Sequence, residues 1–240
     1  MINVTVWNEY FHEQNEESVK EIYPNGIHGA IKDFLQCEDI SVTTSTFYDE
    51  EFGLSEELLK KTDVLIWWSH KKNRDLPDEI ASRVQNFVLC GMGIIFLHSA
   101  HFSKPFKLLM GTSCTLSWRE DGDSERIWVA TPSHPIAKGL AKYFDIKSDE
   151  TYCEPFGIPN PDETVFLGWY DGGEVFRSGC TFYRENGRIF YFQPGHETYP
   201  VFYDKNVQTI IKNAVFWANP VRKVDSIPCP KVEKKIPFEN

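Results

Sequence analysis

The stretch that decides the fold is Asp63-Val-Leu-Ile-Trp-Trp68, followed further along the chain by Gly93-Ile-Ile-Phe-Leu97. Both are short, continuous apolar runs, the pattern of β-strands that are buried on both faces. Between them, Pro77 opens a segment with apolar residues at helical spacing up to about Leu89. A buried strand, a helix and a second buried strand predict parallel pairing through a right-handed crossover.

The same alternation extends outward from this unit. Strands are predicted at 2–7 and 40–47, and helices at 26–35, at 55–59 and from the turn after 97 to Gly111. The middle third predicts antiparallel strands and long loops added to one edge, with a hairpin at Asn186-Gly187, and 207–217 predicts a closing helix. We therefore expect one α/β domain over 1–219, with a mostly parallel sheet flanked by helices. Residues 220–240, rich in Pro and Lys, are expected to form an extended arm or a loose tail.

Composition narrows the classes of function. The formal net charge of −10 disfavours binding to nucleic acid or to anionic membranes. No apolar run is long enough to span a bilayer, and the first residues lack the features of a signal peptide, so a cytoplasmic location is expected. The six cysteines form no C-x-x-C pair, which argues against a zinc ribbon or a redox motif. Phosphate-binding glycine motifs are also missing from the sequence, so no nucleotide cofactor is expected.

Histidines follow several of the predicted strands. In open parallel sheets, ligands bind outside the carboxyl ends of the strands, and six of the seven histidines fall at this end: His12, His28, His70, His98, His101 and His196. Any single one could be a hydrogen-bonded structural residue. Together, imidazoles on separate strands suit acid–base chemistry or binding of a divalent metal, zinc first among them.

Ser99 follows the second buried strand in a turn of small residues, as in a nucleophile elbow. In one interpretation it is a nucleophile, with His196 as base and Glu197 as the orienting group. In the other it caps the following helix, whose free N–H groups bind an anion or a hydroxyl. The motif G-x-S-x-G is absent.

Aromatic and charged residues near the same edge suit a sugar, which has an apolar face and a belt of hydroxyls. The tryptophans could equally be core residues, and the Arg–Glu pairs could be solvated ion pairs. The predicted substrate contacts are Trp7, Glu9, His70, His101, Trp118, Arg119, Glu174, Arg177 and Tyr199.

Several segments together resemble the ThuA-like (trehalose utilisation) family. They are VTVWNE, YPNGIHGAI, DVLIWWSH, GMGIIFLHSAHFSKPFK, LMGTSCTLSWRE, HPIAKGL, GGEVFRSGC and FYFQPGHETYP, spread over about residues 1–218. The resemblance implies a class I glutamine amidotransferase-like fold with a flavodoxin-like core. It also implies a role in the use of trehalose and related disaccharides through oxidised keto-sugar intermediates.

The wider superfamily has a cysteine nucleophile at the elbow and a late histidine–glutamate pair. In this chain the elbow falls at His98, or at Ser99 with a shift of one residue, and the pair falls at His196 and Glu197. Without an elbow cysteine, glutamine hydrolysis through a thioester is not expected. We expect His98, His196, Glu197 and Ser99 to be the catalytic candidates, and His28, His98 and His196 to be the metal-ligand candidates.

The leading hypothesis is therefore an enzyme of carbohydrate metabolism, an isomerase, lyase or hydrolase acting on a disaccharide or keto-sugar. The alternative is a non-catalytic sugar-binding or regulatory protein on an amidotransferase scaffold without its cysteine. A small-molecule sugar is the expected ligand. A homo-oligomer and a functional link to a sugar dehydrogenase are expected as well.

Overall fold

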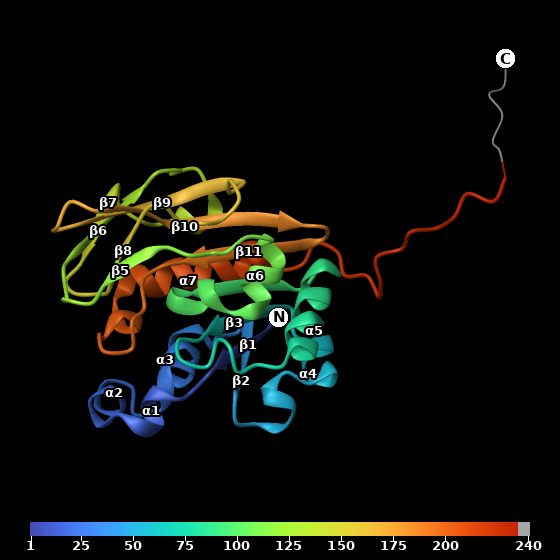
Figure 1. Cartoon of the computed structure of the whole chain (residues 1–240), viewed down its shortest axis with the longest axis horizontal. Helices are drawn as coiled ribbons and strands as arrows, with labels where there is room; N and C mark the ends of the chain where they lie inside the picture. Colours follow the sequence, from blue (N-terminus) through green and yellow to red (C-terminus); the bar gives the residue numbers. More distant parts are fainter. Residues whose placement is uncertain (235–240) are drawn as a thin grey trace, which may run out of the picture.

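The computed structural model describes residues 1–234, which are built around a single nine-stranded sheet (Figure 1). Five of its strands are parallel, in the order β2-β1-β3-β4-β11. Every residue of β3 and β4 is buried, because helices cover both faces of the sheet at its centre. The bounds of these strands are Ile2–Asn8 (β1), Ile40–Thr46 (β2), Val64–Trp68 (β3), Gly93–Leu97 (β4) and Gly187–Phe192 (β11).

An antiparallel extension continues the sheet beyond β11, in the order β10-β9-β6-β7. The predicted hairpin is present, with Arg184 paired to Gly187 across the turn between β10 and β11. Two short strands, β5 and β8, form a separate sheet. The bounds are Ser117–Arg119 (β5), Glu125–Val129 (β6), Tyr143–Ile146 (β7), Thr151–Cys153 (β8), Glu163–Tyr170 (β9) and Val175–Arg184 (β10).

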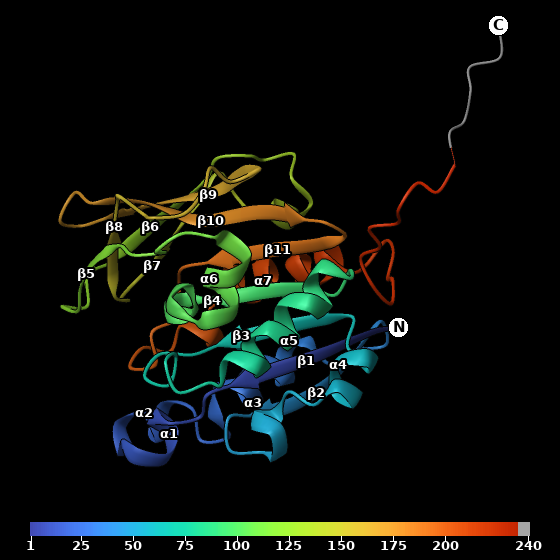
Figure 2. The ribbon, with the colours of Figure 1, turned by 45° about the vertical axis from the view of Figure 1, so that its right-hand side comes forward.

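Helices form a layer on each face of the sheet (Figure 2). One apolar cluster joins the sheet to α3 (Gly26–Leu35) and α7 (Lys205–Ala218). The other joins it to α4 (Glu56–Lys61), α5 (Asp78–Leu89) and α6 (Lys104–Met110). The remaining helices are short, and none within residues 1–234 could cross a membrane. They are α1 (His12–Asn15), α2 (Glu17–Ile22) and the 3₁₀ turns Glu50–Gly53 (η1), His98–Phe102 (η2), Pro135–Ala137 (η3) and Val201–Tyr203 (η4).

Side-chain caps define where several helices begin. The Oγ of Ser55 accepts a hydrogen bond from the backbone of Leu58 at the start of α4, as the sequence predicts. At the start of α6 the cap is Ser103. The interpretation of Ser99 as the cap of that helix is therefore wrong, because the 3₁₀ turn η2 separates β4 from α6.

The first residues after α7 return to the amino ends of the parallel strands. Lys223 donates to a carboxylate oxygen of Asp63 at 2.6 Å, and the backbone N–H of Val224 donates to the oxygen of Cys90 at 2.9 Å. Gly91, at φ +119°, has no side chain to collide with the Arg222 oxygen that packs against it. The segment beyond residue 225 extends away from the body of the molecule as far as residue 234 (Figure 1). The last six residues of the predicted tail lie outside the described residues.

Candidate functional site

His98 stands at the turn where β4 ends. Its φ is +52°, in the left-handed region that residues other than glycine rarely adopt. The side chain is fully buried, and its Nδ1 lies 2.9 Å from the backbone oxygen of Gln193. Because a carbonyl oxygen only accepts, Nδ1 carries a hydrogen, and Nε2 faces the site. Of the two elbow positions that the sequence offers, His98 is the one with the strained backbone.

Glu150 and His196 complete a buried group with His98. Oε2 of Glu150 lies 3.0 Å from Nε2 of His98, yet it has no aligned hydrogen-bond partner within residues 1–234. The ring of His196 is centred 5.3 Å from that of His98, and its Nδ1 lies 2.8 Å from Oγ1 of Thr198. One nitrogen or oxygen atom from each of the three side chains lies within 4.8 Å of the others, so the group could hold a metal ion.

The charges in this group are set by burial and by neighbouring ions. Burial lowers the pKa of His98, but the Glu150 carboxylate outweighs it and raises that pKa to about 9. Burial and the neighbouring His98 together lower the pKa of His196 to about 4. At neutral pH the site therefore holds a neutral imidazole on His196, and a positive charge is favoured beside Glu150. That charge is either a proton on His98 or a bound cation.

A second group lies directly beside the first. Oε1 of Glu197 is 3.0 Å from Nε2 of His12 and 2.9 Å from Nδ1 of His70. The rings of His12 and His70 stack with their centres 5.1 Å apart. These three side chains could also hold a metal ion, by the same distance limit. His12 lies on α1, His70 follows β3, and Glu197 follows β11, so three separate segments of the chain meet here.

Two fully buried carboxylates fix the loops that carry these histidines. Glu9 accepts hydrogen bonds from the backbone N–H groups of residues 70–72, at 2.6 to 2.8 Å. Asp149 accepts from the backbone of Gly195 and His196, at 2.9 and 3.1 Å. Glu9, predicted as a substrate contact, therefore positions the loop of His70. Several hydrogen bonds to one carboxylate fix a loop more firmly than a single neutral bond does.

A pocket of about 240 Å³ opens beside the two groups. Inside it, Oγ of Ser99 lies 3.1 Å from the hydroxyl of Tyr152, whose ring stacks on that of His98. No histidine in the described chain hydrogen-bonds to Ser99, so the arrangement of a serine nucleophile with its base is not formed. The lining residues are His70, Asn73, Ser99, His101, Phe102, Thr115, Leu116, Trp118, Glu150 and Tyr152.

The predicted substrate contacts take different places. His70, His101 and Trp118 line the pocket, and Trp118 is 65% exposed at its edge. The ring of Tyr199 lies 5.7 Å from that of His196. Trp7 instead stacks on Trp67 in the core, at 4.0 Å between ring centres, and does not line the pocket.

The predicted arginine and glutamate contacts are engaged in ion pairs. Arg119 donates to the carboxylate of Glu174 at 2.9 Å. Arg177 donates to Glu154 at 2.7 Å. Neither arginine lines the pocket described above. A sugar would have to compete with these carboxylates for the guanidinium groups.

His28, predicted as a metal ligand, lies at the same end of the sheet but outside both groups. Its Nδ1 is 3.0 Å from Nδ2 of Asn8, the last residue of β1. Burial lowers the pKa of His28. The third potential metal ligand beside His98 and His196 is Glu150, not His28.

Sequence reasoning missed Asp149, Glu150 and Tyr152. The two adjacent acids precede the short strand β8, in the region where the sequence pattern is weakest. The only sequence signal for these residues was an Asp-Glu pair followed by Thr and Tyr. Nothing in the local sequence indicates that Glu150 and Tyr152 lie beside His98, at the end of β4.

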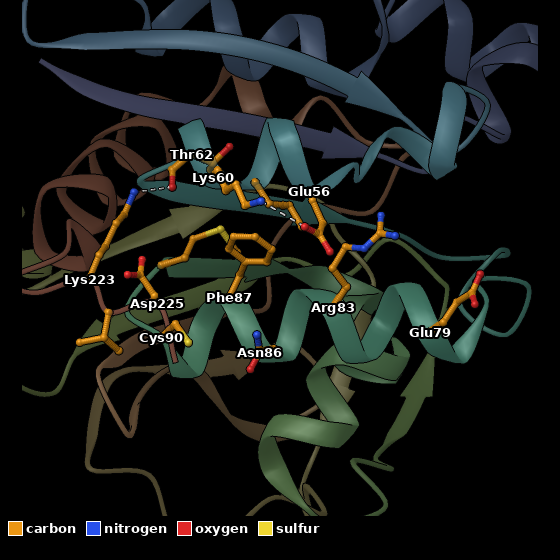
Figure 3. Close-up of a pocket in the computed structure, with 13 residues that line it drawn as sticks. Glu56, Lys60, Thr62, Glu79, Arg83, Asn86, Phe87, Cys90, Lys223 and Asp225 are labelled. Atoms are coloured by element: carbon orange, nitrogen blue, oxygen red, sulfur yellow. Dashed lines mark hydrogen bonds and ion pairs between the residues drawn. The ribbon is translucent and has the colours of Figure 1, made fainter. Parts of the chain in front are cut away.

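A larger cavity, of about 600 Å³, lies along α4 and α5 on one face of the sheet, from Glu79 to Lys223 (Figure 3). It is bounded by α4, α5 and residues 223–225. Several of its charged side chains are paired, as Lys60 is with Glu56 at 3.2 Å and Lys223 with Asp63 at 2.6 Å. No histidine lines it. The histidine groups thus lie beside the smaller pocket, which His70 and Glu150 line.

Comparisons with known proteins agree with this architecture. A ThuA-like protein from Parabacteroides merdae ATCC 43184 superposes with a TM-score of 0.66 at 16% identity, covering 95% of this chain and 93% of that one. A ThuA-like protein from Bacteroides uniformis ATCC 8492 gives 0.65 at 17% identity, covering 90% and 91%. A GMP synthase subunit from Thermoplasma acidophilum gives 0.51 at 15% identity, covering 90% and 93%. The fold is thus ThuA-like and similar to that of glutamine amidotransferases, as expected.

No curated protein sequence matches the chain. The sequence model of the ThuA family, whose description is trehalose utilisation, matches residues 3–218. That match covers nearly the whole chain and includes all of β1 except Ile2, both histidine groups and α7. The chain therefore belongs to the ThuA family.

Proposed function

We propose that this protein is a metal-dependent enzyme of carbohydrate metabolism that acts on the carbonyl group of a keto-sugar. The observation that carries the proposal is the pair formed by Nε2 of His98 and Oε2 of Glu150. They lie 3.0 Å apart in a buried site without the alignment of a hydrogen bond. Two potential metal ligands that lie this close without a hydrogen bond between them suit a cation bound by both.

The surroundings of the ligands support a metal. In metal sites the second nitrogen of each histidine is usually held by a hydrogen bond. Here Nδ1 of His98 donates to the Gln193 oxygen. Nδ1 of His196 accepts from the backbone N–H of Thr198 at 3.3 Å, and with a metal on Nε2 it would instead donate to the Thr198 hydroxyl, 2.8 Å away. Two imidazole nitrogens and a carboxylate leave a fourth position free, which is the donor set of a catalytic zinc site. Zinc is the ion that we propose.

The pocket supports a sugar as the substrate. Its volume of about 240 Å³ is below the range of roughly 300–1,000 Å³ found for drug-sized ligands, so it suits one hexose ring. The exposed indole of Trp118 offers a flat apolar face for that ring. The hydroxyls of Ser99 and Tyr152 can hydrogen-bond to the sugar. Burial raises the pKa of Tyr152 well above its usual value, so its hydroxyl keeps its hydrogen.

The chemistry follows from the polarised carbonyl. A cation at His98, Glu150 and His196 would draw electrons toward the oxygen of a ketone and acidify the neighbouring C–H bond. Isomerisation or elimination is then accessible, which fits the use of oxidised disaccharides. A dehydrogenase that oxidises a sugar hydroxyl would supply this substrate. With His98 at the elbow in place of a cysteine, glutamine hydrolysis through a thioester is not proposed.

The test is turnover of keto-trehalose and related keto-glycosides by zinc-loaded protein. We expect activity in the wild type and its loss in His98→Ala and His196→Ala. His134→Ala, a buried histidine that caps η3 far from the site, is the matched control and should keep activity. Equal turnover in His98→Ala and wild type would overturn the proposal. Sugar binding by calorimetry without any turnover would instead favour a non-catalytic sugar-binding protein.

A further inference from the structure

The group formed by His12, His70 and Glu197 is not used by the function proposed above. All three side chains lie in a confined space, with exposed fractions of 2%, 25% and 3%. An isolated carboxylate at this depth is costly unless positive charge or hydrogen bonds offset its burial. The group therefore needs its own explanation.

The hydrogens on His12 can be assigned from its contacts. Nδ1 lies 2.7 Å from a carboxylate oxygen of Glu16, so Nδ1 carries a hydrogen and donates it. Nε2 is buried and lies 3.0 Å from Glu197, yet it has no aligned hydrogen-bond partner in the part of the chain that the structure describes. His98 is similar in that one nitrogen is held by an acceptor and the other faces a carboxylate out of alignment, but Nε2 of His98 also lies 3.5 Å from the hydroxyl of Tyr152.

Glu197 connects this group to the first one. Its Oε1 lies 3.0 Å from Nε2 of His12, and its Oε2 lies 3.8 Å from Nε2 of His196. The rings of His70 and His196 are centred 5.5 Å apart. One carboxylate therefore reaches donor atoms of both groups, as the bridging carboxylate of a two-metal centre does, where the ions are roughly 3.5–4 Å apart.

We propose that His12, His70 and Glu197 bind a second divalent metal ion, and that Glu197 bridges it to the ion at His98, Glu150 and His196. The inference rests on the proposed function for the first ion and adds a substrate class. A pair of ions suits two neighbouring oxygens, one on each metal. The substrate class is accordingly a ketone with a hydroxyl on the adjacent carbon, which a keto-sugar supplies.

The contact of His70 with Glu197 alone would not explain the group. Nδ1 of His70 lies 2.9 and 3.0 Å from the two oxygens of Glu197 and can donate to them. That hydrogen bond accounts for His70 and for part of the charge of Glu197. It leaves Nε2 of His12 without an aligned partner among the described residues, whereas a metal ion satisfies all three side chains at once.

The experiment counts metal ions in the full chain. Protein stripped with a chelator is reloaded with Zn²⁺ at neutral pH, desalted and measured by elemental analysis. We expect two ions per chain in the wild type and in His134→Ala. We expect one in His12→Ala, in the more conservative His12→Gln and in His98→Ala. Circular dichroism shows that each variant is folded.

The outcomes separate the two proposals. One ion in the wild type, still present in both His12 variants and lost in His98→Ala, would overturn the second site and leave the first. No ion in the wild type would overturn both. A further readout uses Mn²⁺ as the probe: spin coupling between two ions in the wild type, replaced by an isolated-ion spectrum in His12→Gln, supports the bridge. An isolated-ion spectrum in the wild type contradicts it.

Discussion

The histidine site and the larger cavity along α4 and α5 both contain charged groups, but these groups differ in burial. Around the histidine site, at the carboxyl ends of the strands, Glu9, Asp149 and Glu150 are at most 4% exposed. In the larger cavity, Lys60 and Glu56 form a pair in which both side chains are more than 60% exposed. Buried charge costs folding free energy, whereas exposed pairs contribute little in either direction.

We propose that this difference marks where function has been built at the expense of stability. A chain optimised only to fold would not enclose four imidazoles and several carboxylates in one place. The cavity along α4 and α5 is larger, but the Lys60–Glu56 pair in it is exposed. Cavity size alone would therefore point to a different part of the molecule. Buried polar atoms without aligned partners, such as Oε2 of Glu150, are the observation on which we base the proposed site.

The largest expected effect is on turnover, and only the histidine site should show it. Glu150→Gln keeps the shape of the side chain and removes its charge, so turnover of a keto-sugar should fall on the order of 10²–10³-fold, as when one preorganised group is lost. Glu56→Gln, in the cavity along α4 and α5, should leave turnover unchanged. Steady-state kinetics of both variants provide the measurement. A similar loss of turnover in both variants would show that the two regions do not differ in their role in catalysis.

The next effect is on stability. Asp149→Ala leaves the backbone N–H groups of Gly195 and His196 without their carboxylate, and should lower the free energy of unfolding by about 3 kcal/mol. Asp63→Ala removes a partly exposed carboxylate from Lys223 and should cost about 1 kcal/mol or less. Urea unfolding at neutral pH compares the two. Equal losses would show that burial does not set the strength of these contacts.

A smaller effect depends on pH. Burial raises the pKa of Glu125 from 4.5 to about 8, so the folded state keeps a proton that the unfolded state releases. This group therefore lowers stability as pH rises between about 5 and 8, by up to about 1.4 kcal/mol per pH unit. Glu125→Gln cannot ionise, so its stability relative to wild type should increase over that range. Urea unfolding at several pH values measures the difference, and a constant difference contradicts the shift.

The smallest effect is expected in the cavity along α4 and α5. Arg83 pairs with the half-exposed Glu51 at 2.6 Å. Arg83→Ala should change the free energy of unfolding by about 1 kcal/mol or less and leave metal content and turnover unchanged. Thermal unfolding and elemental analysis provide the test. A loss of bound metal would mean that this cavity and the histidine groups are coupled.

The sequence predicts the parallel half well, because its signals are local. The runs that became β3 and β4 are continuous and apolar, and Ser55 caps its helix as its position indicates. The short helices α1 and α2 were not predicted, since neither is long enough to show a helical repeat. The strands β5, β7 and β8 were missed because they are only three or four residues long, too short to show an alternating pattern.

The site could be predicted only in part. The end of the sheet that carries it follows from the topology rule, and His98 and His196 do lie together there. Which further group joins them depends on contacts between distant segments. Glu150 reaches His98 through β8, whereas His28 turns to Asn8 although it begins near the same edge. Where a side chain points and which distant segment it meets depend on the tertiary fold, and no local sequence pattern encodes them.

The left-handed backbone of His98 has an evolutionary consequence. An imidazole at φ +52° carries a conformational penalty of roughly 1–2 kcal/mol that glycine would avoid. Glycine would relieve that penalty, but it would leave the buried Glu150 carboxylate without its partner, which costs roughly 3–5 kcal/mol. Selection for heat resistance alone should therefore retain histidine at position 98 in a ThuA sequence, even where the substrate is no longer used.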